Sequence, residues 1–192
     1  MAELEEKKSD CTALQNPRLH ALLRYWYKKR GSRMMPSRYD IDPVEIPRLL
    51  PIVLLAEIDG DDARIRLMGM EATAGYGSEM RGRSIRDFDL EEFTASWIEA
   101  FQMAVKSSEP VVVAGMLIGG SRRRRVESVL MPMSDGEGAA SHVLGGLVIK
   151  PMSPDEQVRP VPPVTHALRF AHRVADSAED CVGSESCAGG VR

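Results

Sequence analysis

Five apolar, strand-length segments, divided two and three by one long interruption, constrain the fold of this chain more than any other feature. The segments are residues 52–58, 63–68, 110–118, 123–131 and 141–149. Asp59-Gly60 separates the first two segments, and such a pair between apolar runs is typical of a β-hairpin. Gly119-Gly120 and residues 135–138 supply the later short turns. Because short turns join neighbouring strands, we expect an antiparallel sheet.

Helical patterns fill the interruption. Residues 71–76 predict a short helix, and Asp89 with Glu92 forms a capping pair before a longer helix at residues 90–106. The apolar stripe of the longer helix is Phe93, Trp97, Phe101 and Ala104. Strands interrupted by one helical block indicate an α+β fold, with a five-stranded antiparallel sheet and the helices packed on one face.

An N-terminal helix precedes the first strand. Asn16 and Pro17 provide its N-cap and its first position, and Gly31 ends it. We therefore expect a flexible arm over residues 1–15 and one domain with its N-terminal helix over residues 16–150. Residues 151–192 begin Pro-rich, contain a short helical pattern at residues 164–175 and end in a composition typical of disorder.

Charge and cysteine content restrict the class of protein. The net charge is -3, whereas a domain that binds nucleic acid is usually basic. The longest apolar runs are far shorter than the ~20 residues of a membrane-spanning helix, and the N-terminus has no signal-peptide pattern. The cysteines are Cys11, Cys181 and Cys187. An odd count without a secretory signal favours a reducing, cytoplasmic location.

Motifs for catalysis are missing from the sequence. Gly75-Tyr76-Gly77 lacks the third glycine of a dinucleotide loop, because residue 80 is methionine. Ser141 and His142 are merely adjacent, and neither GxSxG nor HExxH occurs. We expect no enzymatic activity, no catalytic residues and no metal site, although a triad assembled in space stays open.

Three stretches of the chain, in order, resemble a known family. They are residues 22–58 (LLRYWYKKRGSRMMPSRYDIDPVEIPRLLPIVLLAEI), 64–85 (RIRLMGMEATAGYGSEMRGRSI) and 124–138 (RRVESVLMPMSDGEG). They resemble PAS domains of a bacterial subfamily of short stand-alone proteins, over roughly residues 19–150. The resemblance implies a sensor or protein-interaction module, usually a homodimer, with a small pocket between the helices and the sheet and an unidentified signalling partner.

The PAS resemblance directs attention to one group of side chains as pocket lining. The candidates are Phe93, Trp97, Phe101, Met68, Met116 and Met131. Aromatic rings and flexible thioethers suit a small apolar or planar ligand. The alternative that we favour for the aromatic stripe is ordinary core packing on the sheet. The cofactor stays unknown. Haem would need an axial ligand, for which His142 has no supporting constellation, and residues 12–180 lack the cysteine of photochemical flavin modules.

The N-terminal helix is the candidate interface for a homodimer. Its apolar face is Leu19, Leu22, Leu23 and Trp26. We expect exposed Tyr25 and Tyr27 to flank this face. The alternative is that the face packs on the chain's own sheet, in which case a charge at Trp26 would unfold the protein.

A run of four arginines, Arg122, Arg123, Arg124 and Arg125, follows the turn at Gly119-Gly120. Neighbouring side chains on a strand point to opposite faces, so the four cannot form one cluster. We favour a solvated hairpin end, and the alternative is a docking site for an anion or an acidic partner. Nucleic acid is the least favoured partner, because no aromatic residues interleave the run.

The sequence thus predicts a PAS-like sensory module that acts through small-ligand sensing, protein–protein interaction or both. One alternative is a ligand-binding or catalytic α+β domain. The other is a nucleic-acid binder that uses the hairpin at Arg122–Arg125.

Overall fold

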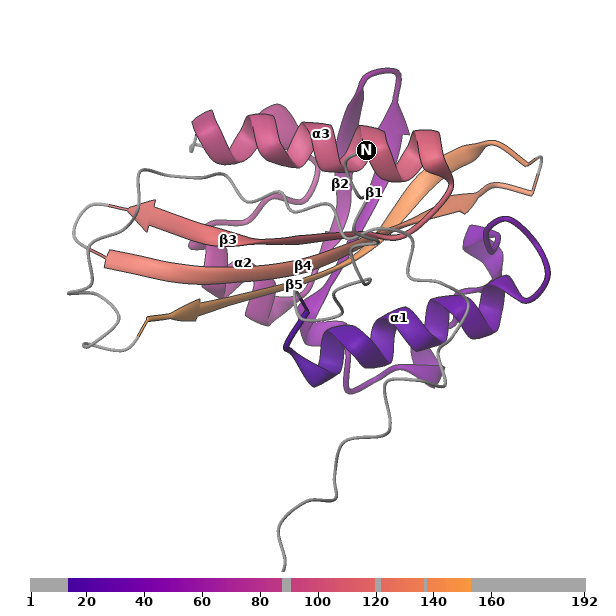
Figure 1. Cartoon of the computed structure of the whole chain (residues 1–192), viewed down its shortest axis with the longest axis horizontal. Helices are drawn as coiled ribbons and strands as arrows, with labels where there is room; N and C mark the ends of the chain where they lie inside the picture. Colours follow the sequence, from indigo (N-terminus) through magenta and orange to yellow (C-terminus); the bar gives the residue numbers. More distant parts are fainter. Residues whose placement is uncertain (1–13, 88–90, 120–121, 137, 153–192) are drawn as a thin grey trace, which may run out of the picture.

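The computed structural model describes residues 14–87, 91–119, 122–136 and 138–152. Its strands are β1 (Val53–Asp59), β2 (Asp62–Met68), β3 (Val111–Gly119), β4 (Arg122–Ser134) and β5 (Ala140–Pro151). They form one antiparallel sheet with the order β2-β1-β5-β4-β3. The predicted five-stranded antiparallel α+β fold is confirmed, and Figure 1 shows the sheet between helices.

Three α-helices and several 3-10 turns surround the sheet. The helices are α1 (Pro17–Arg30), α2 (Met70–Tyr76) and α3 (Glu91–Ser107). The 3-10 turns are η2 (Arg38–Asp40), η3 (Pro43–Glu45), η4 (Leu50–Ile52) and η5 (Ile85–Asp87). Asn16 caps α1 as predicted, since its side chain accepts a hydrogen bond from the amide of Arg18 at 3.0 Å. The predicted caps at Asp89 and Glu92, residues 1–13 of the predicted arm and the helical pattern at residues 164–175 lie outside the described side chains or residues.

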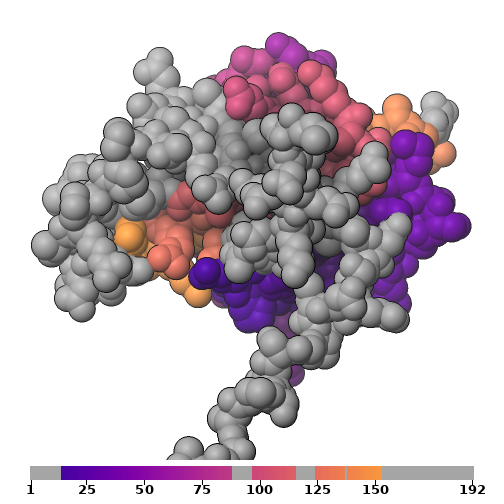
Figure 2. All heavy atoms as spheres, viewed as in Figure 1, coloured from indigo at the N-terminus to yellow at the C-terminus, as the bar shows by residue number. Residues whose placement is uncertain are grey.

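Alternation along the strands divides the core into two layers. Buried side chains on the first face pack with α2 and α3, and on the strands they are Leu54, Ala56, Ala63, Ile65, Met68, Val111, Val113, Val126, Leu130, Val143 and Leu147. Those on the second face pack with α1, and on the strands they are Val53, Val112, Val129, Met131, Met133, Leu144 and Val148. The helices of the interruption share one face as predicted, while α1 covers the other face. Figure 1 shows α1 and α3 on opposite sides of the sheet, and in Figure 2 the indigo atoms of α1 lie below and the pink atoms of α3 above.

Strand β4 changes its neighbour near its end. Its pairing with β3 stops at Leu130, and Pro132 follows two residues later. A proline inside a sheet is tolerated where no neighbouring strand needs its amide. The segment after α1 takes the place of β3 there, because the amide of Ser134 donates to the carbonyl of Pro36 at 3.0 Å. Ser37 and Ser134 form a parallel bridge beside this bond.

Candidate functional site

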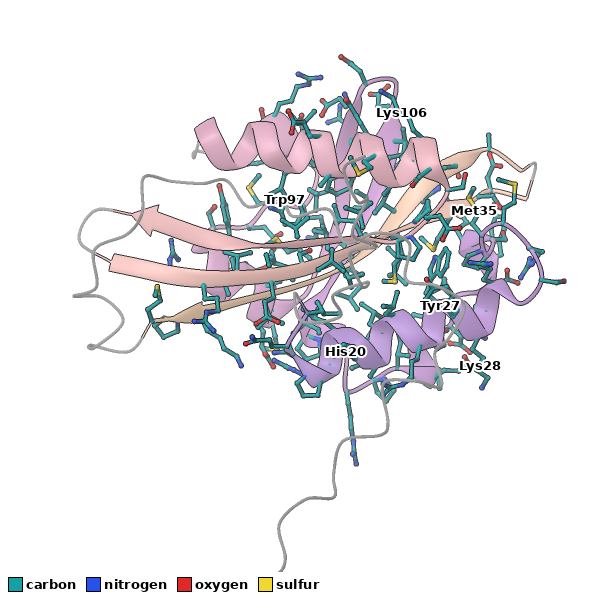
Figure 3. All side chains as sticks on the ribbon, viewed as in Figure 1. His20, Tyr27, Lys28, Met35, Trp97 and Lys106 are labelled. Atoms are coloured by element: carbon teal, nitrogen blue, oxygen red, sulfur yellow. The ribbon has the colours of Figure 1, made fainter. Side chains whose placement is uncertain are left out.

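The face of the sheet beneath α3 brings together half of the candidate pocket residues. Trp97 and Phe101 are fully or almost fully buried in this layer, and their ring centroids lie 5.6 Å apart with the planes tilted by 40°. Met68 is buried in the same layer at the end of β2. Figure 3 labels Trp97 between α3 and the sheet. The predicted inward direction of the α3 stripe therefore holds for these two aromatic residues.

The remaining pocket candidates do not join them. Met131 is buried in the opposite layer, against α1, so its assignment to the same pocket was wrong. It is an odd-numbered residue of β4, whereas Val126 and Leu130 on the even positions face α3. The side chains of Phe93 and Met116 lie outside the described part of the structure.

Ser128 is a fully buried polar residue on this face of the sheet, and it is not among the residues selected from the sequence. It lies between Val126 and Leu130 on β4, and its strand neighbours are Val113 on β3 and Leu147 on β5. Its exposed fraction is 0%, and its hydroxyl has no hydrogen-bond partner among the described residues. A hydroxyl on the inward parity of a strand was the signal in the sequence that could have identified it.

Helix α1 is fixed to the sheet by its apolar face. Leu19, Leu22 and Trp26 are 0% exposed and Leu23 is 6% exposed. The indole Nε1 of Trp26 donates to the carbonyl oxygen of Pro132 at 2.9 Å. These residues form the core of their own chain, so the expected homodimer interface on this face was wrong and the alternative of internal packing describes them.

Polar contacts reinforce the attachment of α1. The carboxylate of Glu127 accepts hydrogen bonds from the amides of Gln15 and Asn16 at 2.9 and 2.8 Å, next to the positive end of the helix. Arg18 forms a two-pronged ion pair with Glu71 of α2, at 2.9 and 2.7 Å. These contacts join the first turn of α1 to β4 and to α2.

Tyr25 is buried, which corrects the expectation that it is exposed. Its exposed fraction is 9%, and its hydroxyl accepts a hydrogen bond from the amide of Asp42 at 2.8 Å. Burial raises the pKa of the Tyr25 hydroxyl. Tyr27 is partly buried and labelled in Figure 3. Thus Tyr25 joins α1 to the segment that leads to η3.

The arginine run does not act as one unit. Arg124 donates from Nη1 to the carbonyl oxygen of Gly75 at 2.6 Å, at the C-terminal end of α2. A cation at this position interacts favourably with the helix dipole. Arg125 is exposed, and the side chains of Arg122 and Arg123 lie outside the described part. Arg124 therefore has a structural contact that the sequence did not predict.

A second polar cluster lies at the start of β5, on the side away from α3. His142 is 6% exposed, and its Nε2 lies 3.0 Å from Nη1 of Arg38. Its Nδ1 lies 2.8 Å from Oγ of Ser141. Burial and, secondly, the charge of Arg38 lower the pKa of His142, while Glu57 and Asp135 act in the opposite direction. His142 thus lies buried near one end of the central strand, between Glu57 of β1 and Met133 of β4.

The described residues meet neither the requirements of a metal site nor those of a membrane-spanning helix. No group of three His, Cys, Asp or Glu side chains gathers there as it would to hold a metal ion. Within the same residues, no helix combines the length and hydropathy needed to span a bilayer.

A family model described as a PAS domain matches residues 14–148. No curated protein matches the chain.

Several solved structures are similar to part of the chain. The PAS domain of BvgS from Bordetella pertussis is 18% identical, with coverage of 59% of this chain and 85% of that one and a TM-score of 0.46. A light-oxygen-voltage domain studied with a flavin analogue is 15% identical, with coverage of 59% and 86% and a TM-score of 0.45. The Vibrio cholerae VqmA dimer is 10% identical, with coverage of 62% and 53% and a TM-score of 0.45, so this chain spans about half the length of VqmA.

Proposed function

The chain belongs to the PAS domain family, whose members generally act as sensory modules, and on that premise we propose that it senses a small molecule bound between the sheet and α3. The single observation that carries the proposal is Ser128. A buried hydroxyl without a partner costs about 1–3 kcal/mol relative to a paired one. A ligand with one hydrogen-bonding group at this position would supply the missing partner.

The apolar side chains of the same core layer indicate the class of ligand. Trp97, Phe101 and Met68 offer aromatic faces and a polarizable sulfur to an apolar or planar molecule. No charged side chain is buried among the described residues of this layer. Since an unpaired charge is costly in such surroundings, we infer a neutral ligand with an apolar body and one polar group. Few convergent polar groups within an apolar lining are typical of small-molecule sites.

We propose that the signal leaves the domain through protein–protein contacts, including a homodimer. The buried face of α1 is already occupied by its own sheet, so the contacts would use outward-facing residues instead. Three exposed large hydrophobic side chains follow α1 closely: Met34, Tyr39 and Val44, which are 69%, 74% and 82% exposed. Such exposed side chains are candidates for contacts with a partner. In this proposal the protein has no catalytic role and works in the cytoplasm.

The test is native mass spectrometry and absorbance spectroscopy of the protein before and after incubation with a small-molecule cell extract. The expected result is a reproducible added mass on the wild-type chain, which Ser128→Ala loses. Ser134→Ala, the same change at the end of the same strand, should retain it. A wild-type chain that stays bare after incubation would overturn the proposal of ligand sensing. Equal retention by both variants would place the ligand away from Ser128.

A further inference from the structure

The contact between Arg38 and His142 joins the segment after α1 to the start of β5. Arg38 is the first residue of η2, and His142 is the third residue of β5. Their side chains meet at 3.0 Å between Nη1 and Nε2. The guanidinium of Arg38 also lies over the ring of Tyr39, with 4.8 Å between Cζ and the ring centroid. Arg38 therefore links an exposed aromatic residue to a buried imidazole.

Hydrogen-bond chemistry fixes the protonation state of His142 in this contact. A guanidinium can only donate, so Nε2 of His142 must be the acceptor and carries no proton. The proton of the neutral ring then resides on Nδ1, which donates to Oγ of Ser141 at 2.8 Å. The observed arrangement requires a neutral His142.

Protonation would reverse this contact. A proton on Nε2 places a second donor and a second positive charge opposite Nη1 of Arg38. The hydrogen bond is lost and replaced by repulsion at short range. The imidazole is 6% exposed and enclosed by strands, whereas Arg38 is exposed, so Arg38 is the group that can move.

The other charged groups around His142 do not remove this repulsion. Glu57 lies opposite His142 on β1, but its carboxylate is already paired with Arg66 of β2. Asp135, in the turn after β4, is the other acidic group and favours the protonated ring, whereas Arg66 opposes it. Met133, which pairs with His142 on β4, carries no charge. Arg38 is the cation that touches the ring, and hence it determines the response.

The remaining ties of residues 36–40 are independent of His142. The amide of Ser134 donates to Pro36, and Asp40 pairs with Arg33 at 2.7 Å. Burial tends to raise the pKa of Asp40, but the amide of Ser37 and the guanidinium of Arg33 outweigh it and lower that pKa. The Arg66 hydrogen bond lowers the pKa of Glu57. Both carboxylates therefore stay ionised in mildly acidic solution, where a histidine changes its charge.

We propose that Arg38 and His142 form a proton-operated latch, which tightens residues 36–40 onto the sheet at neutral pH and loosens them in mildly acidic solution, where the bonds at Pro36 and Asp40 alone hold the segment and open more often. Protonation frees the side chain of Arg38 from β5 while the sheet keeps its pairing. The domain would thereby carry a proton response on the face opposite to the proposed ligand site, and this response does not depend on a ligand.

Amide hydrogen exchange at pH 7.5 and pH 5.5, corrected for intrinsic rates, tests the latch. Two amides serve as reporters. The amide of Asp40 donates to the carbonyl of Ser37 within the segment, and the amide of Ser134 donates to the carbonyl of Pro36. In the wild type we expect exchange at both to be several-fold faster at pH 5.5. His142→Gln keeps a neutral acceptor for Arg38 and should remain protected at both pH values. Arg38→Met should exchange fast at both.

Two further measurements keep the result unambiguous. His20→Gln, which alters a histidine at the other end of α1, should show the same pH response as the wild type. The midpoint of the His142 titration, followed by NMR, should move to higher pH in Arg38→Met. Wild-type protection that is equal at both pH values would overturn the proposal. A pH response that persists in His142→Gln, or an unchanged His142 midpoint in Arg38→Met, would do the same.

Discussion

The indole of Trp26 and the carbonyl of Pro132 form a hydrogen bond of 2.9 Å that joins helix α1 to strand β4. The bond occurs where β3 no longer pairs with β4, so that α1 replaces part of a missing strand neighbour. Trp26 is also 0% exposed. Helix α1 is for these reasons a part of the folded core, and its removal would expose one whole face of the sheet.

Substitution of Trp26 should affect folding before assembly. Trp26→Phe keeps an aromatic ring but leaves the Pro132 carbonyl without its donor, and we expect a loss of about 1–3 kcal/mol in the free energy of unfolding. Trp26→Ala should cost about 3–5 kcal/mol. Urea denaturation followed by circular dichroism measures both. Wild-type stability of Trp26→Ala together with a change of oligomeric mass would contradict this account.

The close approach of α1 to the sheet depends on Gly146. A Cβ at this position would stand 2.5 Å from Cδ2 of Leu19 and 2.9 Å from Cδ2 of Leu22. Gly146→Ala should therefore lower the free energy of unfolding by about 1–3 kcal/mol through overpacking. Gly115→Ala is the matched control on β3, because nothing lies within 4 Å of its added Cβ. Equal stabilities of the two variants in thermal unfolding would show that α1 is not held against the sheet here.

Glu127 should stabilise the first turn of α1 through the amides of Gln15 and Asn16. Glu127→Ala leaves both amides without this acceptor, and we expect a cost of about 1–2 kcal/mol, as for the loss of an N-cap. Glu127→Gln keeps one acceptor oxygen and should lose less. Hydrogen exchange at the two amides gives the local readout. Unchanged exchange in Glu127→Ala would mean that the contact does not hold the helix.

The hydroxyl of Ser128 should be of no benefit to the ligand-free protein. Because it is buried without a partner among the described residues, Ser128→Ala should leave the free energy of unfolding unchanged or raise it by up to about 1–3 kcal/mol. Urea denaturation of protein freed of small molecules is the measurement. A clear destabilisation would indicate that the hydroxyl already has a partner.

Stability should depend on pH through His142. Its pKa is lowered in the folded state, so the unfolded chain takes up a proton near pH 6.5 that the folded chain binds only at lower pH. The free energy of unfolding should then fall as the pH decreases below about 6.5 and level off once folded His142 is protonated. Urea denaturation across this range should show a weaker decline in His142→Gln. Identical pH profiles would contradict the lowered pKa.

The strands and turns could be predicted because their signals are local. The Asp59-Gly60 signal correctly indicates the hairpin between β1 and β2, although its turn is Gly60-Asp61 between the paired Asp59 and Asp62, and Gly60 has a φ of 62°. Asn16 caps its helix through the amide two residues further on. Each of these features depends only on residues that are close together in the sequence, so the sequence alone predicts it.

The faces of the elements could not be predicted with the same success. Both parities of β4 are apolar since both faces of the sheet are covered, so alternation alone did not separate Met131 from Leu130. The apolar stripe of α1 looks the same whether it meets its own sheet or a second chain. The pair Arg38 and His142 is separated by 104 positions, and only the fold brings it together.

The location of a bound molecule on one face of the sheet is the central claim, and methyl NMR tests it most directly. Neighbouring residues on the same strands report opposite faces: Val113, Leu130 and Leu147 face α3, whereas Val112, Val129 and Leu144 face α1. The probe is the molecule recovered from the wild-type protein or, for a bare chain, a library of neutral planar fragments. The account predicts that the probe changes the methyl chemical shifts of Val113, Leu130 and Leu147 only, and that Ser128→Ala makes these changes smaller. Shifts centred on the second three, or no shifts with any probe, would contradict it.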